Sequence, residues 1–338
     1  MDLNMIWFLL VGVLIIGYAI LDGFDLGVGV LHLFARSEEE RRLHINAIGP
    51  VWDGNEVWLL TGGGALFAAF PIVYATVFSG FYLALMLLLV ALIFRAVSME
   101  FRGKVDAAGW KKAWDVAFGI GSLLPAVLFG VAFGNILRGI PLDAAHNYTG
   151  SFFTLLNPYA VLIGVLSLVL FTMHGALYLA LKTGGPLQAR VIGWISPLWM
   201  ATVVLYLLAT LATMFVSPFL FERMLGYPLF YVLFLLLLGA CIMIPIAAKA
   251  AKYGRAFAAS SVTIAMMIGL SALSLFPRLV PSLGDLTNSL TIYNASSSEA
   301  TLTTMLVIAL IGMPLVIAYT IFIYRAFKGK VVLHADSY

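Results

Sequence analysis

The sequence predicts an all-α integral membrane protein with about nine transmembrane helices, for three reasons. First, 62% of the 338 residues are hydrophobic and only 10% are charged, whereas soluble domains carry about 25% charged residues. Second, apolar segments of about 20 residues, the length of one membrane crossing, recur along the chain. Third, Lys and Arg concentrate in alternate connections between these segments. We expect one integral membrane domain over residues 1–338, without a cleavable signal peptide, because the first apolar run is too long for one.

Nine apolar segments account for most of the chain, and short polar connections separate them. Each segment is long enough for a helix that crosses the hydrocarbon core once. Prolines inside several segments are tolerated, because neighbouring helices supply partners for the freed backbone groups. The expected helices cover about 5–34, 50–72, 74–98, 114–137, 154–181, 191–215, 228–248, 256–276 and 303–325.

The distribution of charge predicts the orientation of these helices. Of the 19 Lys and Arg residues, only Arg138, Arg223 and Arg278 belong to connections that follow an even-numbered segment. The other 16 belong to the opposite side, which includes the C-terminal tail. Because positive residues mark the cytoplasmic face, we expect the N-terminus outside and the C-terminus in the cytoplasm.

The first segment contains two acids in a stretch that is otherwise apolar enough to face lipid. Asp22 and Asp25 lie three residues apart in AILDGFDLGVG, so they share one face of the helix. An acid at the bilayer centre costs roughly 2.5–3.5 kcal/mol. Gly23 and Gly27 would let a second helix approach closely, so we expect this face to be buried against protein. The alternative is that one of the aspartates is merely packed, protonated or hydrogen-bonded.

The second segment adds two acids in its first turns, Asp53 and Glu56, within GPVWDGNEVW. A favourable interaction with the helix dipole would explain them without a function. In the expected orientation, however, Asp53 lies near the cytoplasmic surface and Asp25 roughly 13 Å deeper. Acids that step inward from the cytoplasm are what a proton path needs. Arg95 in the third segment is the expected counter-ion of Asp25, unless its side chain snorkels to the membrane surface.

The sequence gives no sign of a metal centre. Only His174 lies well inside a segment, and we expect it to be hydrogen-bonded to a neighbour rather than bound to a haem. No HxxxH, CxxC or ExxH spacing occurs. The single cysteine, Cys241, allows no disulfide within the chain. Chemistry on oxygen or metals would have to come from another chain.

Several stretches of the sequence resemble subunit II of the cytochrome bd quinol oxidases, including the cyanide-insensitive members. They are LDGFDLGVGVL in the first segment, ERRLHINAIGPVWDGNEVWLLTGGGALFAAFP across the second, FSGFYLALMLLLVALIFR in the third, GVAFGN in the fourth and SLTIYNASSSEATL before the last. The resemblance covers nearly the whole chain, and the WDGNEVWL block is long and specific.

This resemblance implies a terminal respiratory oxidase that oxidises quinol and reduces dioxygen to water. It implies nine helices, as two four-helix bundles plus a peripheral helix, in a bacterial or archaeal plasma membrane. Two b haems and one d haem would belong to the partner subunit I, and some members have a structural quinone or small single-helix subunits. This chain would scaffold subunit I and supply a cytoplasmic proton path, on which the family's acids match Asp53 and Asp25. Membrane lipid and quinol are expected partners, and nucleic acid is not.

Two other functions remain open from the residues alone. Buried acids beside Arg95 would also suit a proton-coupled secondary transporter, although the sequence shows no internal repeat of the kind that many transporters have. A purely structural membrane partner is the third possibility, and the graded depth of the acids argues against it. Copurification with a larger, haem-rich subunit would separate the oxidase subunit from both alternatives.

Overall fold

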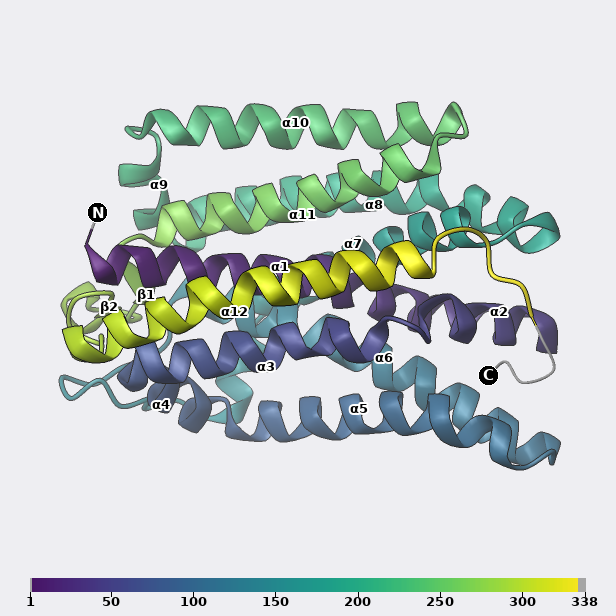
Figure 1. The fold of residues 1–338 in the computed structure, drawn as a ribbon. Coiled ribbons are helices and arrows are strands. Elements are labelled where there is room, and N and C mark those ends of the chain that lie inside the picture. Colours follow the sequence, from purple (N-terminus) through teal and green to yellow (C-terminus); the bar gives the residue numbers. More distant parts are fainter. Residues whose placement is uncertain (1, 334–338) are drawn as a thin grey trace.

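The computed structural model describes residues 2–333, apart from the side chain of Arg223. Long helices lie side by side along one direction and form the body of the molecule (Figure 1). Eight of the described helices are long and apolar enough to cross a membrane. They are α1 (Leu3–His32), α5 (Tyr82–Phe101), α6 (Ala108–Arg138), α7 (Pro158–Lys182), α8 (Gly185–Val216), α10 (Pro228–Lys249), α11 (Tyr253–Leu275) and α12 (Glu299–Ala326).

A further helix, α3 (Trp52–Ala69), runs alongside these eight (Figure 1). It has 18 residues but is not among the eight, and its two acids and its glycines make it less apolar. The predicted class, an all-α membrane protein, is confirmed. The count of nine spans, the division into two bundles plus a peripheral helix and the orientation stay predictions.

The third apolar segment begins later than predicted. In place of one helix over about 74–98, the chain forms a short helix α4 (Pro71–Gly80), which ends before α5. Pro71 occupies the first turn of α4. Because proline has no N–H to donate and its fixed φ suits a helix start, it ends α3 and opens a new helix.

The connections contain short elements that hydropathy does not indicate. In α2 (Glu38–Ile48), the Ser37 side chain accepts a hydrogen bond from the Glu40 N–H and caps the helix. The longest connection contains an antiparallel pair, β1 (Arg278–Val280) and β2 (Leu290–Thr291). The remaining short elements are η1 (Arg102–Lys104), η2 (Phe152–Leu156), α9 (Phe219–Met224) and η3 (Leu286–Asn288).

The core is centred on the crossing of α1 and α7. A Cβ on Gly27 would collide with the carbonyl oxygen of Phe171, and a Cβ on Gly175 would lie 2.5 Å from the Gly27 backbone. At Gly23 the ring of Phe171 takes the space that a Cβ would need. The prediction that these glycines admit a second helix is therefore confirmed, and the second helix is α7.

The two ends of the bundle differ. The N-terminus, α4 and the β1–β2 pair lie at one end, and α2 and the C-terminal segment lie at the other (Figure 1). All connections with the expected cytoplasmic charges lie at the α2 end. We call it the basic end, and it comprises 33–51, 102–107, 183–184, 250–252 and 327–333.

Candidate functional site: a buried acid–arginine cluster

Two fully buried charged side chains meet between α1 and α5. Nη2 of Arg95 donates a hydrogen bond to Oδ1 of Asp22 at 2.7 Å, and neither side chain is exposed. The same nitrogen lies 3.5 Å from Oε2 of Glu56 on α3, whose side chain is 21% exposed. One guanidinium group therefore bridges carboxylates from two other helices. We call Asp22, Asp25, Glu56 and Arg95 the acid–arginine cluster.

Asp25 has a different set of partners. Its Oδ2 accepts a hydrogen bond from Nδ2 of Asn55 at 2.8 Å, and the same nitrogen is 3.1 Å from the Leu21 carbonyl oxygen. The Oδ1 of Asn55 in turn accepts from the Tyr324 hydroxyl at 3.0 Å. This chain of bonds connects α1 to α3 and to the last turn of α12. It holds the Asp25 carboxyl group in a fixed direction.

Several polar atoms of this region have no hydrogen-bond partner within the described residues. They are Oη of Tyr18, Oδ2 of Asp22, Oδ1 of Asp25, and Nε and Nη1 of Arg95. A buried polar atom without a partner costs about 1–3 kcal/mol. Such atoms are the usual ligands of ordered internal water, so the cluster is chemically suited to hold water and exchange protons with it.

Asp53 lies in the first turn of α3 with an exposed side chain. The N-cap position belongs to Val51, and no side chain caps this helix, so Asp53 is not an N-cap residue. Asp53, Val57, Leu60, Gly64 and Phe67 recur at helical spacing and are all exposed. We call these five residues the α3 stripe, which is apolar except for the acid at the basic end.

The structure corrects the predicted partner of Arg95. Arg95 is fully buried, so the snorkelling alternative is wrong, but its hydrogen-bonded partner is Asp22 and not Asp25. Three residues apart, the two side chains lie on one side of α1 but about 60° from each other around the helix axis, so the two carboxyl groups meet different neighbours. Asp22 points to α5, and Asp25 points to Asn55 on α3.

His174 forms the hydrogen bonds expected of a buried polar residue. Its Nδ1 lies 2.6 Å from the Ser260 hydroxyl, and its Nε2 lies 3.0 Å from the Ile20 carbonyl oxygen. Because the carbonyl can only accept, Nε2 carries the proton in this arrangement. The prediction that His174 is hydrogen-bonded to a neighbour is therefore confirmed, and both ring nitrogens take part.

A second polar network ties the basic end together. Arg102 binds Asp115 through Nε at 2.5 Å and Glu38 through both terminal nitrogens at 2.9 and 2.7 Å. His32 Nε2 lies 2.8 Å from the same Asp115. The Arg102 guanidinium lowers the pKa of the Glu38 carboxyl group. Burial lowers the pKa of His44, also on α2, to about 3. The hydrogen bonds of Arg102, Glu38, His32 and Asp115 fix α2 against η1 and α6, and α6 against α1.

Sequence reasoning missed Tyr324 and Asp115. Tyr324 lies in the last turn of α12, where a tyrosine is ordinary at a membrane surface, so its hydrogen bond to Asn55 gave no signal. Asp115 follows the two lysines Lys111 and Lys112 and resembles an ordinary surface acid. Within residues 2–333, no group of three or more His, Cys, Asp or Glu side chains could hold a metal ion.

Comparisons with known proteins show the family to which the chain belongs. Residues 3–327 match the family model described as cytochrome bd terminal oxidase subunit II. The chain is 37% identical to cytochrome bd-I ubiquinol oxidase subunit 2 of Escherichia coli (strain K12), over 97% of this chain and 95% of that protein. It is 39% identical to cytochrome bd ubiquinol oxidase subunit 2 of Bacillus subtilis (strain 168), over 98% and 97%. The fold resembles the structure of bd oxidase from Geobacillus thermodenitrificans, with a TM-score of 0.81, 17% identity, and coverage of 97% and 99%.

Apolar helices around buried acids and an arginine, together with bacterial relatives of nearly equal length, define a multi-pass protein of the bacterial plasma membrane. The chain belongs to the cytochrome bd terminal oxidase subunit II family. Quinol oxidation coupled to dioxygen reduction is the activity of that family's complex. The family also implies that the haems are in the partner subunit.

Proposed function

We propose that this chain scaffolds the haem-bearing subunit I and provides a proton path from the cytoplasm through its acids. The observation that carries the proposal is the bridge from Glu56 to Asp22 through Arg95. It joins a half-buried carboxyl group to a fully buried one. The reduction of each dioxygen molecule to water consumes four protons, so a complex of this type needs such a supply.

The path begins at Asp53 in this proposal. Asp53 is exposed at the basic end, and Glu56, three residues further along α3, lies on the neighbouring part of the same helix surface. A carboxyl group can accept and release a proton, which an amide cannot. From Glu56 a proton reaches Asp22 or Asp25 through water bound to the unpartnered atoms around Arg95.

Charge balance supports a relay rather than a static ion pair. The cluster contains three carboxyl groups and one guanidinium group, and net charge is unfavourable in a low-dielectric interior. One arginine neutralises one carboxylate, so the other two carboxyl groups are places where a proton resides. Asn55 and Tyr324 orient Asp25 through their hydrogen bonds and do not themselves need to transfer the proton.

The α3 stripe is the surface that we propose subunit I covers. Leu60 and Phe67 are 72% and 58% exposed in this chain alone. Exposed apolar side chains in line with an exposed acid suit a protein partner, which can cover the former and offer polar groups to the latter. Subunit I on this surface would place Asp53, the start of the path, at the edge of the subunit interface.

We also propose that this chain alone is not catalytic. The two b haems and the d haem, bound in subunit I, would supply the electron transfer and oxygen chemistry. In this chain both His174 nitrogens already form hydrogen bonds, so haem ligation would break one of them. The residues of this chain bind protons and position one another, within a single membrane domain whose basic end faces the cytoplasm. Quinol is the proposed electron donor, as the names of the relatives indicate.

Purification through a tag on this chain tests the assignment. We expect a complex with a larger subunit and the absorption bands of b-type and d-type haem, and quinol-dependent oxygen consumption. The chain expressed without its partner should bind no haem. Stoichiometric haem on the isolated chain that is lost in His174→Ala would contradict the proposal.

A further inference from the structure

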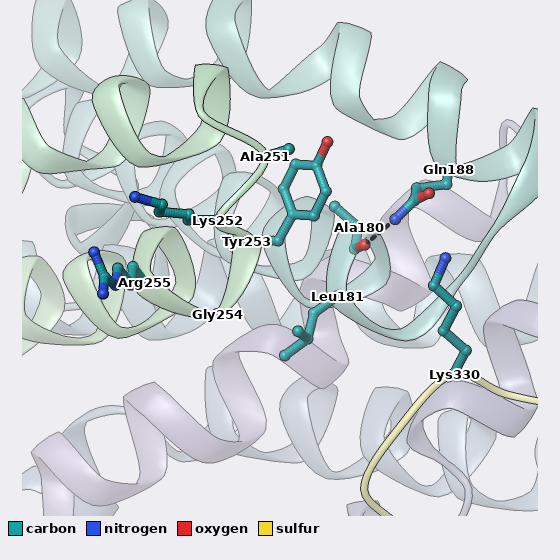
Figure 2. A pocket seen from close by; sticks show the side chains of 9 residues that line it. All are labelled: Ala180, Leu181, Gln188, Ala251, Lys252, Tyr253, Gly254, Arg255 and Lys330. Atoms are coloured by element: carbon teal, nitrogen blue, oxygen red, sulfur yellow. Dashed lines mark hydrogen bonds between the residues drawn. The ribbon is translucent and has the colours of Figure 1, made fainter.

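A cavity at the basic end is lined by none of the residues of the acid–arginine cluster. It has a volume of about 670 Å³ and lies between the end of α7, the start of α8, the turn from α10 to α11 and the C-terminal segment. The residues that define its chemistry are Leu181, Gln188, Lys252, Tyr253, Arg255 and Lys330. Figure 2 shows Lys330 on one side, Lys252 and Arg255 on the other, and the Tyr253 ring between them.

The walls of this cavity carry positive charge without compensation. Lys252, Arg255 and Lys330 form no ion pair within the part of the chain that the structure describes, and no described acidic residue lines the cavity. Other cations at or near the basic end, such as Arg102 and Arg190, are paired with Glu38 and Glu40. An anion in the cavity would therefore meet three cations that no described acid neutralises.

Lys330 is held at the cavity although it belongs to a segment without secondary structure. The Val331 N–H donates to the Lys182 carbonyl oxygen at 2.8 Å, and Nζ of Lys182 donates to the Phe327 carbonyl oxygen at 2.5 Å. These bonds fasten the chain on both sides of Lys330 to the end of α7. Gln188, whose Nε2 donates to the Ala180 carbonyl oxygen at 2.7 Å, is likewise fixed. Hydrogen bonds thus fix the backbone on both sides of Lys330 and the side chain of Gln188 at the wall of the cavity.

The residues around the cavity are of the types found at the depth of lipid headgroups in a membrane. Tyrosine is enriched at the membrane–water interface, and Tyr253 is one of the residues that line the cavity. The apolar side chain of Leu181 forms part of the wall and is 39% exposed. On α10, Ile242 and Ile246 are 58% and 57% exposed and lead toward the turn that forms the cavity. Acyl chains have an apolar surface next to the charged one.

We propose that this cavity binds a phosphate group, and that the phosphate belongs to the headgroup of an anionic phospholipid. Basic pockets between membrane helices on the cytoplasmic side are known to hold such headgroups. The cations bind the phosphate oxygens, and the apolar side chains of α7 and α10 contact the lipid tails. The lipid would fasten the C-terminal segment to α7, α8 and α11.

The test uses the whole delipidated complex and phosphatidylglycerol as the probe, with lipid retained per complex measured by native mass spectrometry. One variant combines Lys252→Gln, Arg255→Gln and Lys330→Gln. The matched control combines Arg36→Gln, Lys104→Gln and Lys112→Gln, three exposed cations of the same end outside the cavity. Each cation near an anionic lipid contributes roughly a factor of five, so the cavity variant should bind phosphatidylglycerol about a hundredfold more weakly. The control variant should bind it as the unaltered complex does.

Two further probes identify the source of the phosphate. Phosphatidylcholine with the same acyl chains should not be retained, and inorganic phosphate should not displace phosphatidylglycerol at equal concentration. If inorganic phosphate does displace the lipid, and the cavity variant abolishes that effect, the cavity is a phosphate site. Its ligand is then the free anion and not the lipid headgroup. Equal loss of lipid in both triple variants, or equal retention of both lipids, would overturn the proposal.

If the cavity variant fails to assemble, a second measurement on the unaltered complex tests the proposal. Photoactivatable phosphatidylglycerol, bound to the unaltered complex, should label the segments around Lys252 and Lys330. Labelling confined to other segments would also overturn the proposal.

Discussion

Replacing Arg95 with leucine should destabilise the folded chain by about 3–5 kcal/mol. Arg95 and Asp22 are both fully buried and their atoms are 2.7 Å apart, so solvent does not screen the interaction. Loss of one member of a buried pair leaves an uncompensated charge, which is the source of that cost. At about 1.4 kcal/mol per factor of ten, the ratio of folded to unfolded chain falls by roughly two to four powers of ten.

A double-mutant cycle identifies the partner of Arg95. We expect Arg95→Leu and Asp22→Asn to show a coupling energy of about 0.5–3 kcal/mol, because each removes the same interaction. Arg95→Leu and Asp25→Asn should be closer to additive, since Asp25 is hydrogen-bonded to Asn55 instead. Titration of the purified chain in mixed micelles with dodecyl sulfate, followed by tryptophan fluorescence, gives the unfolding free energies.

The exposed pair Lys111–Asp106 is the control for this cycle. Its Asp106 side chain is fully exposed, so Lys111→Leu should leave the titration midpoint unchanged. Stronger coupling of Arg95 to Asp25 than to Asp22 would refute the pairing seen in the structure.

Three other predictions concern packing, pH and hydrogen bonding. Gly27→Leu should abolish assembly of the complex, because the side chain would collide with the α7 backbone. The measurement is the amount of haem recovered with the tag. The control Gly63→Leu should assemble, because no atom lies within 4 Å of a Cβ added there. Stability should rise with pH between about 3 and 6.5, because burial lowers the pKa of His44 to about 3 and the folded chain then binds fewer protons than the unfolded one. His44→Phe should flatten the dependence of the unfolding midpoint on pH in that window. Tyr324→Phe should cost about 1 kcal/mol in the same titration, since Asn55 loses a donor.

The membrane class and the residues of the cluster could be predicted from the sequence because both depend on local properties. Hydropathy reveals each helix by itself, and acids such as Asp22 and Asp25 stand out against apolar neighbours. Gly27 predicted a close helix contact for the same local reason, since the absence of a side chain is visible in one residue.

What the sequence could not give is the rotation of each helix and the ends of the helices. The partner of Arg95 depends on how α1 is turned about its axis, which one helix does not determine. The hydrogen bond of Tyr324 to Asn55 joins residues 269 positions apart, so no local pattern in the sequence predicts it. The break between α4 and α5 lies inside one continuous apolar run, so the hydropathy does not change there.

The most direct test of the proposed proton path is the rate of oxygen reduction by the Asp53→Asn complex at saturating quinol. Asparagine keeps the size and polarity of the side chain but cannot relay a proton. We predict unchanged haem spectra with turnover slowed roughly tenfold or more, as expected when a positioned proton carrier is removed. Asp106→Asn, at an exposed acid of the same end, should leave turnover unchanged. A fully active Asp53→Asn complex would contradict the account and remove Asp53 from the path.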